Sequence, residues 1–194
     1  MALTFTKNSK KNSGAAKGKT GGYAFMAVAG TSIPTSLDAE LDKAFFNIGY
    51  VSDDGIASTP SFDATEHKDM NGDVIDTTQD GYGHKVTMTV IEVKKDTMRL
   101  KYGDGNATDE NGVLTVHNKG GVGMRGPLVL ELMLKGARRM RRVYPDAEVT
   151  ELGEEKVVSS DLFAQEVTFT VYPDESTGDY FTDYIESTET TKAA

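Results

Sequence analysis

Residues 30–56 read GTSIPTSLDAELDKAFFNIGYVSDDGI, a stretch in which an apolar stripe lies between a proline and a glycine. Pro34 precedes Thr35, which can cap a helix, and the apolar residues that follow fit a period of 3.6. Gly49 can end such a helix in a left-handed conformation. The pattern predicts one amphipathic helix at about residues 36–48, which packs through Leu37, Leu41, Ala44, Phe45 and Ile48.

The rest of the chain alternates in the manner of β-strands. Val86, Met88 and Val90 share one face of a strand predicted at residues 85–93, and β-branched residues are abundant. The run Lys94-Lys95-Asp96 is interpreted as a hairpin turn into a strand over residues 98–102. Further strands are expected at Val113–His117 and Gln165–Tyr172. The domain is predicted to be mainly β.

The segment from Leu128 to Arg142 fits two structures. Its Leu, Glu, Met, Lys and Arg residues suit a helix, whereas leucines at every second position suit a strand. Gly136 costs about 1 kcal/mol inside a helix and is natural in a hairpin. We therefore favour a strand, a turn and a second strand, with a helix as the alternative.

Two segments have the composition of long loops, residues 58–83 and residues 103–112, because both are rich in glycine, asparagine and aspartate. Asn71-Gly72 in the first segment also suits a type I′ turn. That dipeptide allows a β-hairpin in place of the loop.

Basic and acidic residues are unevenly distributed along the chain, which has 194 residues and a net charge of −9. Residues 1–22 hold five lysines and no acid, whereas residues 143–194 hold 13 acidic and 2 basic residues. We expect a flexible basic arm at 1–22, one domain at 23–185 and a frayed tail at 186–194. The basic and acidic parts are solvated surface or make contacts between copies of the chain. The overall acidity argues against a protein that grips nucleic acid.

Each candidate motif for catalysis or cofactor binding lacks a required residue or spacing. The run GAAKGKT at residues 14–20 has three residues between its glycines, where a phosphate-binding loop needs four. Asp69, Asn71 and Asp73 have the spacing of calcium ligands, but Val74 occupies the position of the required glycine. The three histidines lack metal-ligand spacing, and cysteine is absent. The sequence predicts no enzyme, no cofactor and no metal site.

Three colinear blocks resemble the major tail proteins, or tail tube proteins, of long-tailed bacteriophages, particularly those of actinobacterial hosts. The first is the Gly-Thr, Pro-Thr and Leu-Asp series that ends in GYVSDDG at residues 49–55. The second is VTMTVIEVKKDTMRLKYG at residues 86–103. The third is RRVYPDAEVTEL at residues 141–152, followed by VTFTVYPD at 167–174. The resemblance covers about residues 30–174.

This resemblance implies a β-sandwich or barrel of the tail tube type with one flanking helix and long loops. Such subunits form stacked, usually hexameric, rings through which DNA passes without specific binding. The implied partners are further copies of the chain, a tape measure protein and tail terminator or tip proteins. The implied location is the virion tail, assembled in the host cytoplasm without membrane insertion. The candidate residues for contacts between subunits are Lys7, Lys10, Lys11, Lys17, Lys19, Arg138, Arg139, Arg141 and Arg142.

A β-sandwich binding module for carbohydrate or a cell-surface partner is the alternative. Such sites need exposed aromatic platforms, and the chain has no tryptophan. The candidate aromatic residues are Tyr82, Tyr102, Tyr180, Phe181 and Tyr184.

Overall fold

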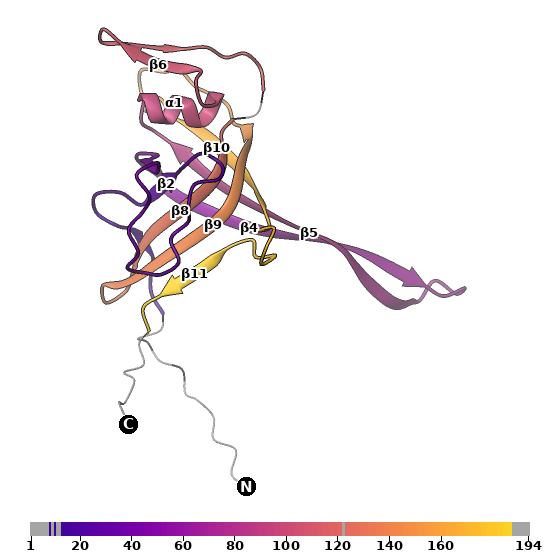
Figure 1. Ribbon diagram of the computed structural model, residues 1–194. Helices are drawn as coiled ribbons and strands as arrows, with labels where there is room; N and C mark the ends of the chain where they lie inside the picture. Colours follow the sequence, from indigo (N-terminus) through magenta and orange to yellow (C-terminus); the bar gives the residue numbers. More distant parts are fainter. Residues whose placement is uncertain (1–7, 9, 11–12, 122, 188–194) are drawn as a thin grey trace, which may run out of the picture.

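The computed structural model describes residues 8, 10, 13–121 and 123–187, which form a curled β-sheet with one long hairpin projecting from it (Figure 1). The elements in chain order are β1 (Lys17–Gly18), β2 (Ala24–Met26), β3 (Phe46–Asn47), β4 (Val51–Lys68), β5 (Val74–Val90), α1 (Lys95–Tyr102), β6 (Ala107–Glu110), β7 (Val113–Val116), β8 (Arg125–Leu134), β9 (Arg138–Leu152), β10 (Gln165–Tyr172) and β11 (Thr182–Ile185).

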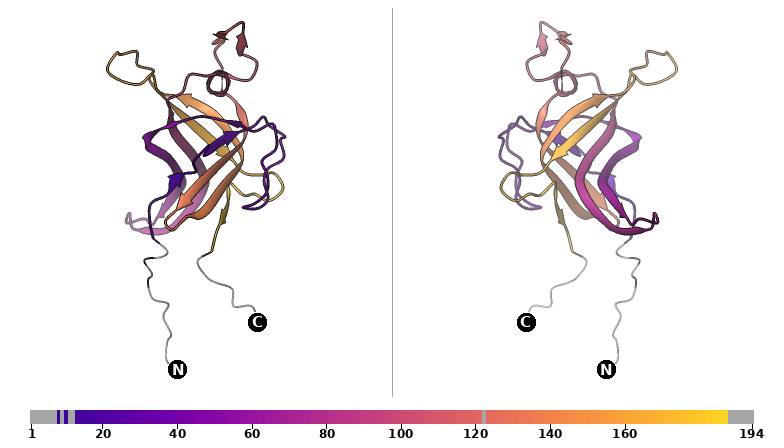
Figure 2. Two further views of the ribbon diagram at one scale, coloured as in Figure 1. Left: turned by 90° about the vertical axis from the view of Figure 1, so that its left-hand side faces the viewer. Right: turned by 90° about the vertical axis from the view of Figure 1, so that its right-hand side faces the viewer.

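Within the described residues, nine strands form one antiparallel sheet in the order β3-β2-β8-β9-β10-β5-β4, with β1 paired to β8 and β11 paired to β9. The sheet curls until its two ends approach each other, as Figure 2 shows. The backbone N–H of Val51 on β4 donates a hydrogen bond to the hydroxyl of Tyr23 beside β2. Strands β6 and β7 form a separate small sheet beside α1.

The core fills the concave side of the curled sheet. The alternating residues Val86, Met88 and Val90 of β5 are buried there, as their pattern predicted. Phe169 of β10 and Tyr144 of β9 are fully buried among them. Burial of large apolar side chains contributes about 2 to 3 kcal/mol each, so this one cluster is the main source of stability.

The strand predictions for the second half of the chain are confirmed. Residues 125–152 form the hairpin β8–β9, in which Gly136 takes a φ of +79° at the turn. The helical alternative for residues 128–142 is therefore excluded. Strand β10 has the predicted bounds, and β7 ends one residue before the predicted His117.

The helix predicted at residues 36–48 is absent: residues 31–45 contain neither helix nor strand. Two carbonyl groups that a helix would use, those of Ser36 and Ala39, instead accept hydrogen bonds from Arg141 Nη1 at 2.6 and 2.7 Å. Phe46 on β3 and Ile48 just after it are both buried, which is the two-residue spacing of a strand. A contact with a residue about a hundred positions away thus overrides the local helical pattern.

The single helix of the described residues is α1, where the sequence predicted a turn and a strand. Thr97, Leu100 and Lys101 are buried at a helical spacing of three and four residues. Asp96 lies in the first turn and Arg99 in the last, which suits the helix dipole. Apolar and polar residues alternate over residues 98–102, but a pattern of five residues is too short to distinguish a strand from a helix.

Residues 58–83 are not a loop, because they form most of the hairpin β4–β5. Asn71 does not adopt positive φ, so the predicted type I′ turn is wrong, although the hairpin itself is present. The carboxylate of Asp69 accepts hydrogen bonds from the N–H groups of Asn71 and Asp73, both at 2.9 Å, and thereby holds a wider turn. The left-handed pair of a type I′ turn occurs instead at Asn111-Gly112, between β6 and β7.

The mainly β fold class is confirmed, with the helix in a different place. Residues 17–22, which the sequence assigned to a flexible arm, include β1 and its pairing with β8. The division of the chain at residues 22 and 185 stays a prediction. No helix in the described part is both long enough and apolar enough to cross a membrane.

Candidate assembly surfaces

The outer part of the hairpin β4–β5, residues 59–82, is here called the ribbon. Every residue from 59 to 80 except Asp69 is exposed, so the ribbon has no core of its own. Its exposed apolar side chains are Phe62, Met70, Val74 and Ile75. An isolated two-stranded ribbon is marginally stable in water, so this length of ribbon is expected to gain from packing against another surface.

The ribbon is also the most acidic projection of the molecule. It holds six acidic residues and one lysine. It lies at the end of the sheet, because β4 is the last strand in the sheet order. An exposed sheet edge offers unpaired N–H and C=O groups to another chain. The ribbon thus combines an open hydrogen-bonding edge with negative charge.

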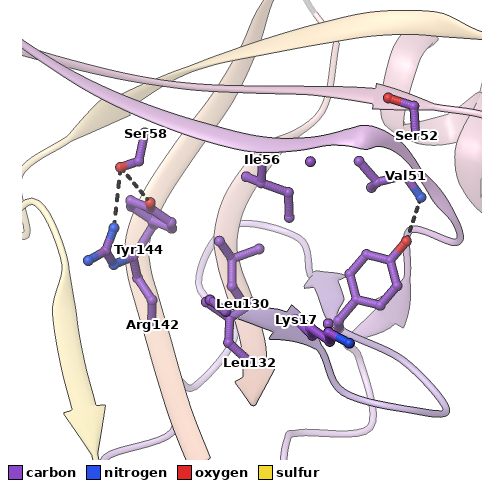
Figure 3. A pocket seen from close by; sticks show the side chains of 13 residues that line it. Lys17, Val51, Ser52, Ile56, Ser58, Leu130, Leu132, Arg142 and Tyr144 are labelled. Carbon is purple, nitrogen blue, oxygen red and sulfur yellow. Dashed lines mark hydrogen bonds between the residues drawn. The ribbon is translucent and has the colours of Figure 1, made fainter. Parts of the chain in front are cut away.

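A network of hydrogen bonds fixes the base of the ribbon to the body, and Figure 3 shows the part of it that joins Ser58 to Tyr144 and Arg142. The ring of His84 on β5 is 3% exposed, with Nε2 2.8 Å from Ser58 Oγ and Nδ1 2.9 Å from the Tyr82 hydroxyl. Ser58 Oγ also lies 3.0 Å from the hydroxyl of Tyr144 on β9. Burial, together with the nearby charge of Arg142, lowers the pKa of His84. The ring is therefore neutral near pH 7.

A cavity of about 440 Å³ adjoins this network, between β4 on one side and β1 with β8 on the other. Ile56, Leu130 and Leu132 give it an apolar lining, whereas Ser58, Tyr144 and Arg142 line its polar end (Figure 3). The polar groups at that end already bind one another, so they hold the two sides of the curled sheet together.

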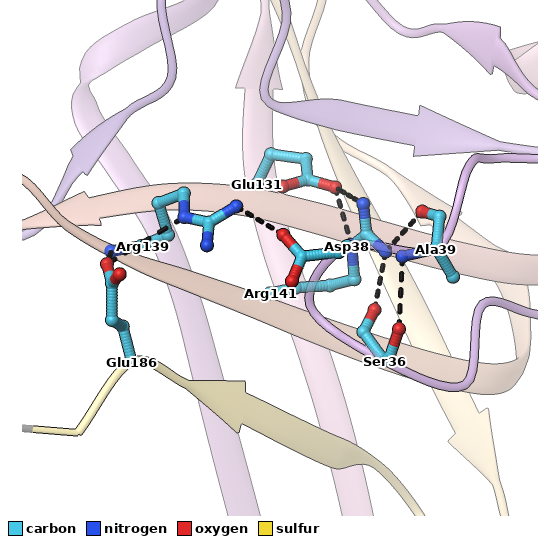
Figure 4. Close-up of polar contacts among 7 residues, drawn as sticks. All are labelled: Ser36, Asp38, Ala39, Glu131, Arg139, Arg141 and Glu186. Atoms are coloured by element: carbon cyan, nitrogen blue, oxygen red, sulfur yellow. Dashed lines mark hydrogen bonds and ion pairs between the residues drawn. The ribbon is translucent and has the colours of Figure 1, made fainter.

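Arg141 is buried, and its partners are internal (Figure 4). Its guanidinium lies 2.6 Å from the carboxylate of Glu131 on β8 and also binds the carbonyls of Ser36 and Ala39. With these donors engaged, Arg141 fastens the segment 31–45 to the outer face of the sheet. Its predicted role at an interface stays a prediction, and the structure gives it a role within the subunit.

The neighbouring arginines of β9 also have partners within the chain. Arg142 forms two hydrogen bonds of 2.6 Å with Asp183 on β11, and its guanidinium lies over the ring of Phe181. Arg139 pairs with Asp38 at 2.6 Å and is about half exposed (Figure 4). Arg138 donates to the carbonyl of Glu186. Arg139 is thus the member of the cluster most accessible to a second molecule.

The lysines assigned to contacts between subunits divide into two groups. Lys17 and Lys19 are exposed at β1 and just after it, and Lys10 is also exposed. Lys7 and Lys11 lie outside the described residues. The interface role of all five lysines stays a prediction.

Three of the aromatic candidates of the alternative binding module, Tyr82, Tyr180 and Phe181, lie in one aromatic cluster around His84. The rings of Tyr82 and Tyr180 have centroids 4.6 Å apart, and Phe181 contacts both His84 and Tyr144. At the outer end of this cluster, Phe62 is 62% exposed and its ring lies 5.2 Å from that of Tyr82. The cluster joins the ribbon to the body and is not an open platform for a sugar.

The sequence reasoning missed the acidic residues of the ribbon as a candidate surface. Asp63, Asp76 and Asp80 lie among glycines and threonines, a composition that indicates a loop. The signal available was the Asn71-Gly72 turn flanked by threonine-rich runs of similar length. It also missed Ser58 and His84, whose contact depends on the register of the hairpin β4–β5.

Comparisons with known proteins give one family and 15 matching chains among the solved structures, two of which follow. The two solved structures come from an extracellular contractile injection system, a PVC sheath-tube complex in the extended state, and from the anti-feeding prophage cap, described as a tube-terminating cap. The first is 14% identical and covers 84% of this chain and 89% of that chain, with a TM-score of 0.42. The second is 12% identical and covers 96% and 100%, with a TM-score of 0.44. No curated protein sequence matches the chain.

The family model is described as phage tail tube protein and matches residues 11–194, nearly the whole chain. The match includes the sheet, the ribbon and the arginines of β9, and extends beyond the three blocks that first indicated a resemblance. The chain belongs to the phage tail tube protein family.

Proposed function

We propose that this protein is the repeating subunit of a phage tail tube, in which copies form rings, six to a ring by the habit of the family, and the rings stack into a hollow tube for DNA. The ribbon is the observation that carries this proposal: it extends an open edge and exposed apolar side chains away from the core. An open strand edge with exposed apolar side chains gains stability when a neighbouring copy covers it.

Closure of the sheets into a ring removes the edges that would otherwise promote uncontrolled aggregation. The described sheet is open at both β3 and β4. A heterologous contact that repeats around a closed ring satisfies both edges with one type of interface. The ring is thus the assembly that accounts for two free edges in one subunit.

An acidic lumen suits the passage of DNA. The net charge of −9 and the 13 acids after residue 142 supply negative groups for such a surface. A like-charged wall repels the phosphate backbone and leaves no sites at which DNA is held. We further propose a tape measure protein and tail terminator or tip proteins as partners, with assembly in the host cytoplasm and a final location in the virion tail.

Negative-stain electron microscopy of the purified chain at high concentration tests this proposal. We expect regular rings or hollow tubes of constant diameter. A chain that stays monomeric at millimolar concentration, by light scattering, in both low and moderate salt would contradict it. A lumen with net positive charge in a reconstruction would contradict the proposed passage of DNA along an acidic wall.

The alternative of a binding module predicts a different response to mutation. Substitution of the exposed Phe62 by Ala would remove binding of a sugar or cell-surface ligand under that alternative. Under the tail tube proposal the same substitution removes no ligand binding, because that proposal includes no sugar or cell-surface ligand.

A further inference from the structure

We propose that Ser58 is a nucleophile for acyl transfer, with His84 as its general base and the cavity beside it as the pocket for the acyl group. The substrate class is a carboxylic ester with a short aliphatic acyl chain. This chemistry goes beyond the proposed tail tube function and does not depend on it. Three features of the molecule support it: the hydrogen bonds of Ser58, the orientation of the His84 ring and the lining of the cavity.

The hydroxyl of Ser58 lies within hydrogen-bond distance of a base. Ser58 Oγ is 2.8 Å from Nε2 of His84, inside the range of about 2.6 to 3.2 Å that joins a nucleophile to its base. Burial of the ring, together with the charge of Arg142, lowers the pKa of His84, so the ring is neutral near pH 7. A neutral imidazole can accept a proton. Ser58 itself is partly exposed, so a small molecule can reach its hydroxyl.

The second ring nitrogen of His84 also has a partner, which fixes the orientation of the ring. Nδ1 lies 2.9 Å from the hydroxyl oxygen of Tyr82. With a proton on Nδ1, that nitrogen donates to Tyr82, and Nε2 accepts the hydrogen bond of Ser58. Tyr82 thus occupies the place of the third member of a catalytic triad. A neutral hydroxyl stabilises the imidazolium less than a carboxylate does, so the expected reaction is slow.

Two further groups direct donors at Ser58 Oγ (Figure 3). The hydroxyl of Tyr144 is 3.0 Å away, and Arg142 Nη1 is 3.4 Å away. Asp183 binds Nε and Nη2 of Arg142 and leaves Nη1 directed at Ser58. These donors stabilise negative charge, first on the attacking oxygen and then on the carbonyl oxygen of a tetrahedral intermediate.

The cavity beside Ser58 has room for an acyl group. Its volume of about 440 Å³ lies in the range of about 300 to 1,000 Å³ that is typical of ligand pockets. Ser58 lies at its polar end, whereas Ile56, Leu130 and Leu132 give it an apolar lining (Figure 3). An aliphatic chain that packs along these side chains places its ester carbonyl at Ser58. The pocket therefore favours an aliphatic ester over a sugar or a charged substrate.

The proposed step conserves atoms and charge. Ser58 Oγ forms a bond to the carbonyl carbon of the ester as its proton moves to His84 Nε2, and the bond from that carbon to the alcohol oxygen breaks. The alcohol leaves with the proton from His84, and the acyl group stays on Ser58. Water, which gives a proton to the same ring, then hydrolyses the acyl group and releases the carboxylic acid.

Hydrolysis of 4-nitrophenyl butyrate by the purified full chain tests the proposal. Its leaving group needs little help from an acid, which suits a weakly basic imidazole. We expect release of 4-nitrophenol and, after an acid quench, a single butyryl group that tandem mass spectrometry assigns to Ser58. Ser58→Ala and His84→Gln should each slow the release at least about tenfold, towards the rate of the urea-unfolded chain.

The matched control is the pair His67 and Thr78 on the ribbon, whose side chains lie 2.9 Å apart in an exposed position. His67→Gln and Thr78→Ala should leave the rate within about twofold, because these residues lie apart from the cavity that Ser58 lines. An equal loss in the ribbon variants would overturn the proposal. Butyryl groups found on lysines and not on Ser58 would overturn it as well.

The variant Ser58→Cys supplies a measurement that does not depend on turnover. It introduces the single thiol of the chain, which has no cysteine of its own. Contact with His84 should make this thiol react with iodoacetamide at pH 7 about tenfold faster than the thiol of Ser61→Cys, which lies on the same strand. Adding His84→Gln to Ser58→Cys should remove the difference, provided that urea denaturation shows a folded chain. A difference that persists in a folded double variant would refute the role of His84.

The outcome for Ser58 is separate from the outcome for the tail tube. Electron microscopy that shows tubes, in a chain without esterase activity, would overturn this inference and leave the proposed function in place. Esterase activity at Ser58 in a chain that forms neither rings nor tubes would support this inference and contradict the proposed function.

Discussion

At the scale of single residues, the buried pair Arg141–Glu131 shows how one side chain sets the path of a distant segment. The side chains are 7% and 10% exposed, and Arg141 also holds the carbonyls of Ser36 and Ala39. Removing one partner of a buried ion pair leaves the other charge uncompensated. Arg141→Met should lower the free energy of unfolding by about 3 to 5 kcal/mol, measured by urea denaturation of the monomer.

The double variant Arg141→Met with Glu131→Met is the control for this prediction. It removes both charges and should recover much of the lost stability. If the double variant is as unstable as the single one, the carbonyls of Ser36 and Ala39, and not the charge of Glu131, account for the loss.

Gly126 is a second position at which a single atom decides stability. Its φ is +152°, and an added Cβ would lie 2.2 Å from the carbonyl oxygen of Ala27. Gly136, at φ +79°, has no atom within 4 Å of such a Cβ. Gly126→Ala should cost more than about 2 kcal/mol through backbone strain and displacement, whereas Gly136→Ala should cost about 1 kcal/mol. Equal shifts of the urea midpoint in the two variants would contradict the predicted clash.

At the scale of elements, His84 makes the attachment of the ribbon dependent on pH. Its ring faces Ser58 and Tyr82 on the hairpin and Tyr144 and Arg142 on β9, and Arg142 is itself paired with Asp183. The pKa of His84 is below its ordinary value of 6.5, so the unfolded chain binds the proton more tightly than the folded chain. This contribution to stability is complete above pH 6.5 and is lost as the pH falls towards the lower, folded-state pKa.

The measurement is the urea midpoint between pH 7 and pH 5. The decrease on acidification should be smaller in His84→Gln than in the unmodified chain, because that variant lacks the titrating ring. His67→Gln should retain the full decrease, since His67 is exposed on the ribbon. An identical decrease in all three proteins would assign the pH dependence to the carboxylates instead.

The elements also show which parts of the fold could be predicted from the sequence. Strand β10 and the inner half of β5 were predictable because alternation over seven or more residues is a local signal. The absence of a helix at 36–48 was not predictable, because it depends on a contact with Arg141. Helix α1 was not predictable either, because its eight residues fit both the helical and the strand period. The partners of the β9 arginines lie on β8, on or just after β11, and in the segment 31–45, contacts that no local pattern specifies.

At the scale of the whole molecule, the body and the ribbon are expected to have separate tasks. The core cluster contains residues of β2, β5, β8, β9 and β10 and none from residues 59–82. The body therefore folds through its own core, and the ribbon adds surface and charge for contacts with other copies. This separation allows assembly to be removed without unfolding the subunit.

A shortened hairpin tests this separation. In the variant, Asn-Gly replaces residues 63–81 and joins Phe62 to Tyr82, which are paired in the intact hairpin. The midpoint of thermal unfolding should stay within about 4 °C of that of the unmodified chain, because the removed residues contribute no core. Rings and tubes should be absent by electron microscopy, because the open edge and six acidic residues are gone. Normal tubes from this variant would show that the subunits join through the body alone, and a large loss of thermal stability would show that the ribbon also supports the fold.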